Sequence, residues 1–117
     1  MLPVGPAVKV TVYLNQDTGA EHGFLHDEIL LYLKARGVNG ATAYRPHAGF
    51  GVHGRLHTAG AGDVAGLHLP VIVYFVETRE KVDSILPALL SMVTDGLVEA
   101  HPTEILKNIS TSERVIS

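Results

Sequence analysis

Histidine, arginine and glycine are concentrated in one segment of the chain, residues 45–68. Four of the seven histidines and six of the twelve glycines lie there, close to Arg45 and Arg55. Glycine leaves backbone N–H groups accessible, and an arginine guanidinium carries a fixed positive charge with several N–H donors. Together they suit an anionic ligand such as a phosphate. Phe50, between two glycines, could stack on a base or fill a contact between subunits.

The same histidines allow a second interpretation, a metal site. His53 and His57 are four residues apart, and His47, Asp63 and His68 could complete a set of nitrogen and oxygen ligands for zinc or another divalent ion. That spacing brings two side chains together on a helix, which this segment does not predict. A metal-binding oligomer therefore stays the alternative to an anion site, with His47, His53 and His57 as its candidate ligands.

Catalytic patterns have less support in this sequence. Gly49-x-Gly51-x-x-Gly54 matches the dinucleotide fingerprint, but a helix must follow its last glycine, and residues 55–68 have no helical period. No serine or threonine stands at a recognisable spacing from a histidine and a carboxylate, so no catalytic triad is predicted. We expect a protein that is not an enzyme. The alternative is a small enzyme that works in a cleft of its sheet.

Length and composition limit the classes of protein further. The chain has 117 residues, which fits a single domain over 1–117, and 46% of them are hydrophobic. A net charge of −3 argues against nucleic acid as a partner. The absence of cysteine excludes a disulfide scaffold. No apolar run reaches the roughly 20 residues that span a bilayer, and the first residues do not resemble a signal peptide. We expect a cytoplasmic protein.

The elements that must position the loop follow from hydrophobic periodicity. Strands are predicted over 8–14, 41–45, 69–76 and 97–106, and helices over 25–36 and 79–95. Thr78 is expected to cap the second helix, Gly37 to end the first, and Pro87 to kink the second. This order predicts an α+β, ferredoxin-like βαββαβ fold, with two helices on one face of a four-stranded antiparallel sheet. Its core covers about 8–107, followed by a polar tail, 108–117.

Two features of this fold have functional consequences. A long loop, 47–68, joins the second and third strands, and loops of that length are usually functional or mobile. The strand over 71–76 is apolar on both of its faces, although two helices cover only one face of the sheet. Large apolar patches rarely stay exposed, so another copy of the chain is expected to cover the second face. The sequence therefore predicts a homo-oligomer assembled through its sheet.

Several segments of the sequence carry a resemblance to a known family. They are Gly37-Val-x-Gly40-Ala41-Thr42, Gly49-Phe50-Gly51-x-x-Gly54-Arg55-x-His57-Thr58, Leu69-Pro70-Val71, Leu86-Pro87-x-Leu89 and Met92-Val93-x-x-Gly96-Leu97-Val98. They resemble the bacterial and archaeal family called domain of unknown function 190, over residues 8–107. That family is similar to the PII-like signalling superfamily, whose ferredoxin-like subunits form trimers. In that superfamily a long T-loop engages partners, and nucleotides bind in clefts between subunits.

The resemblance implies a site and partners. The implied ligand-facing residues are Arg45, Gly49, Phe50, Gly51, Gly54, Arg55 and His57. Thr94, Asp95 and Gly96 fall where PII proteins place the loop that holds phosphates from a neighbouring subunit, although the basic glycine-rich sequence of that loop is missing here. The implied protein is a homotrimeric sensor that binds a small anionic ligand such as an adenine nucleotide. Its implied partner is a membrane transporter such as a fluoride exporter.

Overall fold

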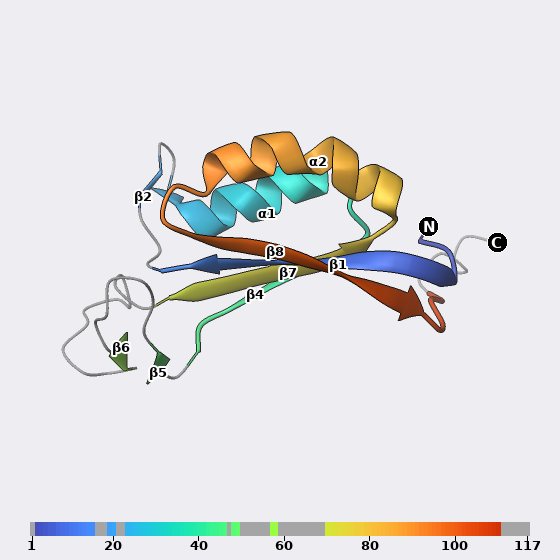
Figure 1. Ribbon diagram of the computed structural model, residues 1–117. Coiled ribbons are helices and arrows are strands. Elements are labelled where there is room, and N and C mark those ends of the chain that lie inside the picture. Colours follow the sequence, from blue (N-terminus) through green and yellow to red (C-terminus); the bar gives the residue numbers. More distant parts are fainter. Residues whose placement is uncertain are drawn as a thin grey trace.

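The protein is built from two layers, a sheet and a pair of helices on one of its faces (Figure 1). The computed structural model describes residues 2–15, 19–20, 23–46, 48–49, 57–58 and 70–110. Its elements in chain order are β1 (Gly5–Leu14), β2 (Gly19–Ala20), β3 (Gly23–Phe24), α1 (Leu25–Ala35), β4 (Ala41–Tyr44), β5 (Ala48–Gly49), β6 (His57–Thr58), β7 (Val71–Glu77), α2 (Arg79–Met92) and β8 (Gly96–Ile105). The predicted ferredoxin-like α+β fold is confirmed.

The main sheet has the strand order β4-β7-β1-β8, and all of its pairs are antiparallel. Its register is continuous across the central strands, since Val12 of β1 lies opposite Val73 on one side and Val98 on the other. β8 is an edge strand, and it contains Pro102 opposite Val8. Proline lacks an N–H donor and is confined to such strands or to bulges.

The core lies between the sheet and the two helices. In β7 every second residue is buried, which places Val71, Val73 and Phe75 against the helices. The alternation follows from the period of two in a strand, and the matching helix stripes follow from the helical period of 3.6. The buried helix residues are Leu25, Ile29 and Leu33 in α1 and Val82, Ile85 and Leu89 in α2.

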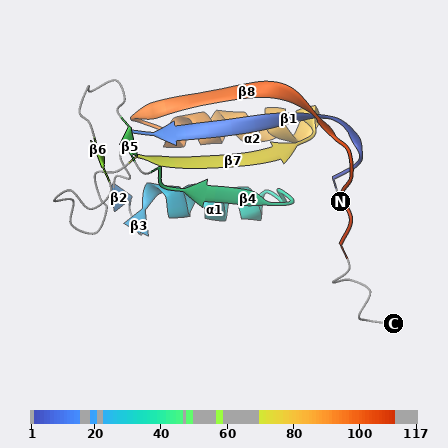
Figure 2. The same ribbon diagram turned by 90° about the horizontal axis from the view of Figure 1, so that it is seen from below.

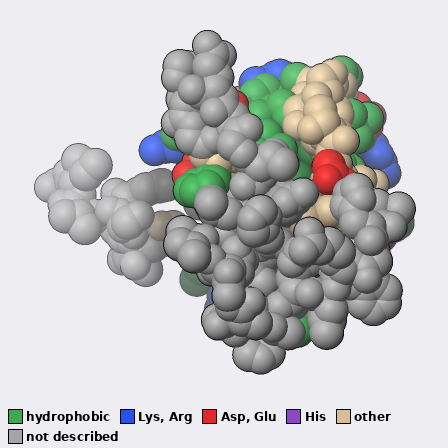
Figure 3. Space-filling view, turned by 90° about the vertical axis from the view of Figure 1, so that its left-hand side faces the viewer, with side chains coloured by type: hydrophobic (Ala, Val, Ile, Leu, Met, Phe, Trp, Pro, Cys, Tyr) green, Lys and Arg blue, Asp and Glu red, His purple; other side chains and the backbone are tan. Residues whose placement is uncertain are grey.

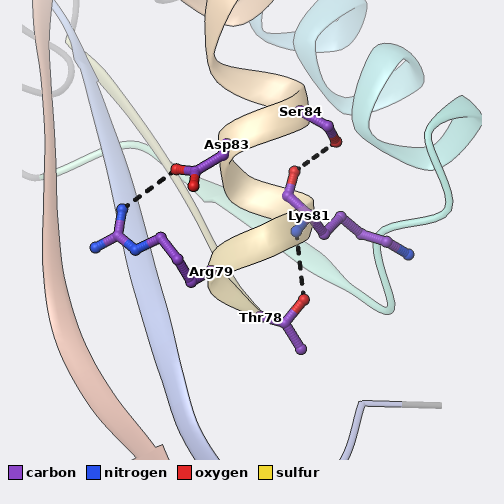
Figure 4. Close-up of polar contacts among 5 residues, drawn as sticks. All are labelled: Thr78, Arg79, Lys81, Asp83 and Ser84. Atoms are coloured by element: carbon purple, nitrogen blue, oxygen red, sulfur yellow. Dashed lines mark hydrogen bonds and ion pairs between the residues drawn. The ribbon is translucent and has the colours of Figure 1, made fainter.

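The end of α1 and the start of α2 form as the sequence predicted, whereas α2 ends at Met92 and not at the predicted residue 95, because Val93 already has an extended backbone. Gly37 takes a φ of +80°, which suits glycine, and just beyond it the Val38 N–H donates to the Leu33 carbonyl at 3.1 Å. Thr78 caps α2, because its Oγ1 accepts a hydrogen bond from the Lys81 N–H at 3.3 Å (Figure 4). α2 continues through Pro87 to Met92, and the kink expected at Pro87 stays a prediction.

Two small ladders were not predicted. β2 pairs with β3 inside the connection between β1 and α1, and β5 pairs with β6 inside the segment expected to be an irregular loop. Each of these strands has only two residues. A pair of residues is too short to produce a periodic pattern, which is why sequence periodicity misses such ladders.

Candidate functional site

The candidate site lies at one end of the sheet. β4 and β1 end there, and β7 and β8 begin there. One residue of each strand stands level with the others across the sheet: Tyr44 of β4, Ile72 of β7, Tyr13 of β1 and Leu97 of β8. Figure 2 shows β2, β3, β5 and β6 at this end, and the beginning of β1 and the end of β8 at the opposite end. Arg45, which follows β4, and the turn that precedes β8 therefore reach the same end of the molecule. They lie at its two opposite edges.

The structure describes part of the predicted ligand-facing set. Arg45 is exposed directly after β4. Gly49 and His57 are eight positions apart in the sequence, but their backbones pair in the β5–β6 ladder. The other members of the set lie outside the described residues: Phe50, Gly51, Gly54 and Arg55. Two candidate metal ligands, His47 and His53, also lie outside them. Their roles stay predictions.

The turn before β8 is fastened to the end of β1. The Asn15 Nδ2 donates to the Asp95 Oδ1 at 2.8 Å, and the Asn15 backbone N–H donates to the Asp95 carbonyl at 3.1 Å. A Cβ atom on Gly96 would overlap the carbonyl oxygen of Tyr13, so the backbones approach here as only glycine allows. Asp95 and Gly96 thus hold the turn in place. Thr94 is exposed, and its hydroxyl is the side-chain group of this turn best suited to a ligand.

The sheet face without helices carries a distinctive row of side chains at this end. We call Tyr44, Ile72, Tyr13 and Leu97 the apolar row. Leu97 is 54% exposed, Tyr44 49% and Tyr13 37%. Next to it, the Tyr74 ring meets Tyr44 edge-on with centroids 6.3 Å apart, and the Lys9 Nζ stands 4.6 Å from the centre of the Tyr74 ring. This face combines apolar side chains with a cation held over an aromatic ring.

Tyr13 of the apolar row has a perturbed pKa. Burial raises the pKa of Tyr13 above its usual value, and the negative charge of Glu99 raises it further. The Tyr13 hydroxyl donates to the Glu99 Oε1 at 3.4 Å. At neutral pH the phenol is therefore protonated and serves as a hydrogen-bond donor within the sheet face.

Two hollows flank the beginning of β4, away from the candidate site. One, of about 280 Å³, lies on the open face of the sheet, where Thr42, Tyr74 and Lys107 line it. The other, of about 460 Å³, lies between β4 and α1 and is lined by residues such as Leu30 and Lys34. Each contains a lysine, and neither has a carboxylate among its lining residues. Sequence patterns gave no sign of them, because their walls come from distant segments.

A buried carboxylate was also missed. Glu77 is only 2% exposed, and its oxygens accept hydrogen bonds from the Asn39 N–H at 2.9 Å, the Asn39 Nδ2 at 2.7 Å and the Thr78 N–H at 3.3 Å. These donors compensate for the loss of water around the charge. Glu77 therefore joins the end of β7 to the turn before β4, and its oxygens are occupied by structural contacts.

Clusters of metal ligands and membrane-spanning helices can be assessed only within the described residues. Within them, no group of three or more His, Asp or Glu residues is placed to hold a metal ion. No helix in the described part of the chain is long and apolar enough to cross a bilayer. Figure 3 looks onto the end of the molecule that carries the candidate site. Its visible described surface mixes hydrophobic, acidic and basic side chains.

The chain is similar to a family of unknown function along most of its length. The profile of the domain of unknown function 190 family (DUF190), described as "Uncharacterized ACR", matches residues 7–105. A UPF0166 protein of Methanocaldococcus jannaschii is 31% identical over 90 residues, which cover 74% of this chain and 80% of that relative. The sequence resemblance stated above is thereby confirmed.

Solved structures share the fold at low identity. CPII, a nitrogen regulatory PII-like protein from Thiomonas intermedia K12, was solved bound to ADP, AMP and bicarbonate. It matches with a TM-score of 0.67 and 18% identity, over 92% of this chain and 94% of that one. A putative PII-like signaling protein from Thermus thermophilus matches with a TM-score of 0.57 and 17% identity, over 89% and 91%. At these identities the likeness shows a PII-like fold.

Proposed function

The chain belongs to the domain of unknown function 190 family, and from this premise we propose that it is a PII-like regulatory protein that binds a small anionic ligand. The observation that carries the proposal is its likeness, over 92% of its length, to a PII-like protein that binds ADP, AMP and bicarbonate. All three of those ligands are anions at neutral pH. An adenine nucleotide is our first candidate, and the proposal includes no enzymatic activity.

The chemistry of the loop supports an anionic ligand. The whole chain has a net charge of −3, so attraction to an anion must come from local cations. Arg45 stands at the base of the loop and Arg55 within it, where both can pair with phosphate oxygens. Gly49, Gly51 and Gly54 would supply backbone N–H donors, His57 would orient the anion, and Phe50 would stack on a base.

The proposal includes assembly and a partner. We propose a homotrimer that uses the open face of the sheet, because Leu97, Tyr44 and Tyr13 leave large apolar surface exposed there. The ligand would bind between copies, and its occupancy would change the loop that a partner protein recognises. A membrane transporter of the fluoride-exporter class is the candidate partner, approached from the cytoplasm.

A melting-temperature panel tests ligand binding. The purified protein is heated with ATP, ADP, AMP, cyclic nucleotides and bicarbonate, and separately with divalent metals and a chelator. A ligand at 100 times its Kd adds about 2.7 kcal/mol to the stability of the native state. For a chain of this length that corresponds to a rise of roughly 10 °C in Tm. We expect such a rise with one of the nucleotides.

Matched variants show whether the loop is responsible. Arg45→Ala and Arg55→Ala should each abolish most of the nucleotide-dependent rise, whereas Arg79→Ala, at the start of α2, should preserve it. A rise that survives both loop substitutions would place the ligand elsewhere. A rise with metal alone, lost in His53→Ala and His57→Ala, would favour the metal-binding alternative. No rise with any nucleotide or bicarbonate would contradict the proposed ligand class.

A further inference from the structure

One asparagine of the chain is followed directly by glycine. The sequence contains three asparagines with their following residues, Asn15-Gln16, Asn39-Gly40 and Asn108-Ile109. The backbone nitrogen of the next residue can attack an asparagine side-chain amide. The attack is easiest when that residue is glycine, because the missing Cβ leaves its backbone free to turn. Of the three asparagines, Asn39 is therefore the one whose sequence most favours this reaction.

The attacking nitrogen is accessible in the structure. Asn39 and Gly40 are exposed, in the turn between α1 and β4. Gly40 precedes the β4–β7 ladder, which begins at the pair Ala41–Phe75, and its N–H donates to no backbone carbonyl among the described residues. A Cβ atom on Gly40 would meet no atom within 4 Å. The hollows of about 280 and 460 Å³ are both lined by Asn39 and Gly40, so water reaches this turn.

The amide that would be attacked is held in place instead. The buried Glu77 Oε2 accepts hydrogen bonds from the Asn39 Nδ2 at 2.7 Å and from the Asn39 N–H at 2.9 Å. Two hydrogen bonds to one oxygen fix the side chain against its own backbone. The leaving nitrogen must also gain a proton, and a carboxylate that accepts from it supplies none. A contact that stabilises the starting amide more than the transition state slows the reaction.

We propose that Asn39 is a deamidation site that Glu77 holds back in the folded protein. The Gly40 nitrogen gives up its proton and bonds to the Asn39 Cγ, the Cγ–Nδ2 bond breaks, and Nδ2 leaves as ammonia with the equivalent of that proton. Water then opens the succinimide ring at one of its two carbonyls and leaves an aspartate or an isoaspartate. One water is consumed, one ammonia is released, and no atom is oxidised or reduced.

Conversion would weaken the corner that Glu77 holds together. The product carries a carboxylate at position 39 in place of an amide donor, beside the Glu77 carboxylate, which is only 2% exposed. Two like charges in a buried contact repel each other with little screening by water. A reaction at one exposed amide therefore loosens the attachment of the turn before β4 to β7, and converted copies are less stable than new ones.

Mass spectrometry of peptides from the full chain tests the site and its restraint. Native and guanidinium-unfolded protein are kept at the same mildly alkaline pH, and conversion is read from the mass gain of an amide that becomes an acid. In unfolded protein we expect Asn39 to convert faster than Asn15 and Asn108, the internal controls. In native protein we expect Asn39 to convert roughly tenfold more slowly than in unfolded protein, because a hydrogen bond to a charged group must first break.

Variants isolate the role of Glu77. In native Glu77→Ala, Asn39 should convert roughly tenfold faster than in wild type. Gly96→Ala, at the other end of the sheet, controls for a general loss of stability and should stay close to the wild-type rate. If Glu77→Ala does not fold, Glu77→Gln takes its place with the same expected direction. Asn39→Asp has the charge of the product and should melt at a lower temperature than Asn39→Ala, which removes the donor without adding charge.

Each contrary result has a distinct meaning. Unfolded protein in which Asn39 reacts no faster than Asn15 would overturn the deamidation site. Native protein that reacts as fast as unfolded protein would overturn the restraint. Equal rates in Glu77→Ala and Gly96→Ala would overturn the role of Glu77. Equal melting temperatures of Asn39→Asp and Asn39→Ala would overturn the effect on stability. All of these measurements are made without nucleotide, so they are independent of the proposed ligand.

Discussion

At the scale of single residues, the polar groups that the structure describes most completely have structural roles. Glu77 accepts three hydrogen bonds, and Asp95 binds Asn15 through both its side chain and its backbone. A carboxylate whose oxygens are occupied in this way is poorly suited to bind a ligand or transfer a proton. Ligand chemistry is therefore expected from the loop residues, of which Arg45 is the described cation.

Replacing Glu77 should destabilise the fold without affecting the candidate site. Glu77→Ala removes the shared acceptor of Asn39 and Thr78 and leaves their donors facing a cavity. Loss of hydrogen bonds to a charged group predicts a decrease of about 2–3 kcal/mol in the free energy of unfolding. The measurement is denaturant unfolding at fixed protein concentration, with the exposed Glu104→Ala as the control, expected within about 0.5 kcal/mol of wild type. Equal effects of the two substitutions would contradict the role of Glu77.

The sequence predicted part of this residue-level picture. Thr78 and Gly37 have local signatures, because a cap or a left-handed residue acts on neighbours three or four positions away. The contact of Glu77 with Asn39 joins residues 38 positions apart, and no local pattern announces it. Gly96 and Tyr13 are also far apart in the sequence, so no local pattern predicts their close approach. The sequence placed Gly96 only directly after the second predicted helix and in the implied ligand loop.

At the scale of elements, the start of β8 depends on close contact with β1. Leu14 lies opposite Gly96, and the turn before Gly96 is bound to Asn15.

Strand and helix periods predicted all six major elements, because each is long enough to show a repeat. Sequence patterns missed the two small ladders, because strands of two residues are too short to show a repeat. Sequence patterns also gave no position for the 94–96 turn relative to Arg45, since the strand order sets it.

Substitution of Gly96 should disturb this contact. Gly96→Ala places a methyl group on the Tyr13 carbonyl, and overpacking of this kind costs about 1–3 kcal/mol. Gly40→Ala is the matched control, because a Cβ there meets no atom within 4 Å. Denaturant unfolding of both variants should show a loss for the first and a change within about 0.5 kcal/mol for the second. A Gly96→Ala variant as stable as wild type would show that β8 can shift away from β1 at no cost.

At the scale of the whole molecule, one face of the sheet is covered by α1 and α2, and no helix of the described residues covers the other (Figure 1). Ile72, Tyr74 and Val76 of β7 project onto that second face and are half-buried there. The sequence indicated this imbalance, because residues 71–76 are apolar at every position. It did not place Tyr44 level with Leu97, because that depends on the register of the four strands.

Stability should therefore depend on protein concentration. If copies dissociate when they unfold, a higher concentration favours the native assembly and raises Tm. For a trimer of chains this size, a tenfold increase in concentration corresponds to a rise of roughly 4 °C. Calorimetry at several concentrations measures this rise. Leu97→Asp places a charge at the end of the apolar row, and we expect its Tm to be independent of concentration and its mass to be that of one chain. Leu31→Asp, on the outer face of α1, should behave like wild type. A wild-type Tm that does not change with concentration would mean that the uncovered sheet face is stable in water without a second copy.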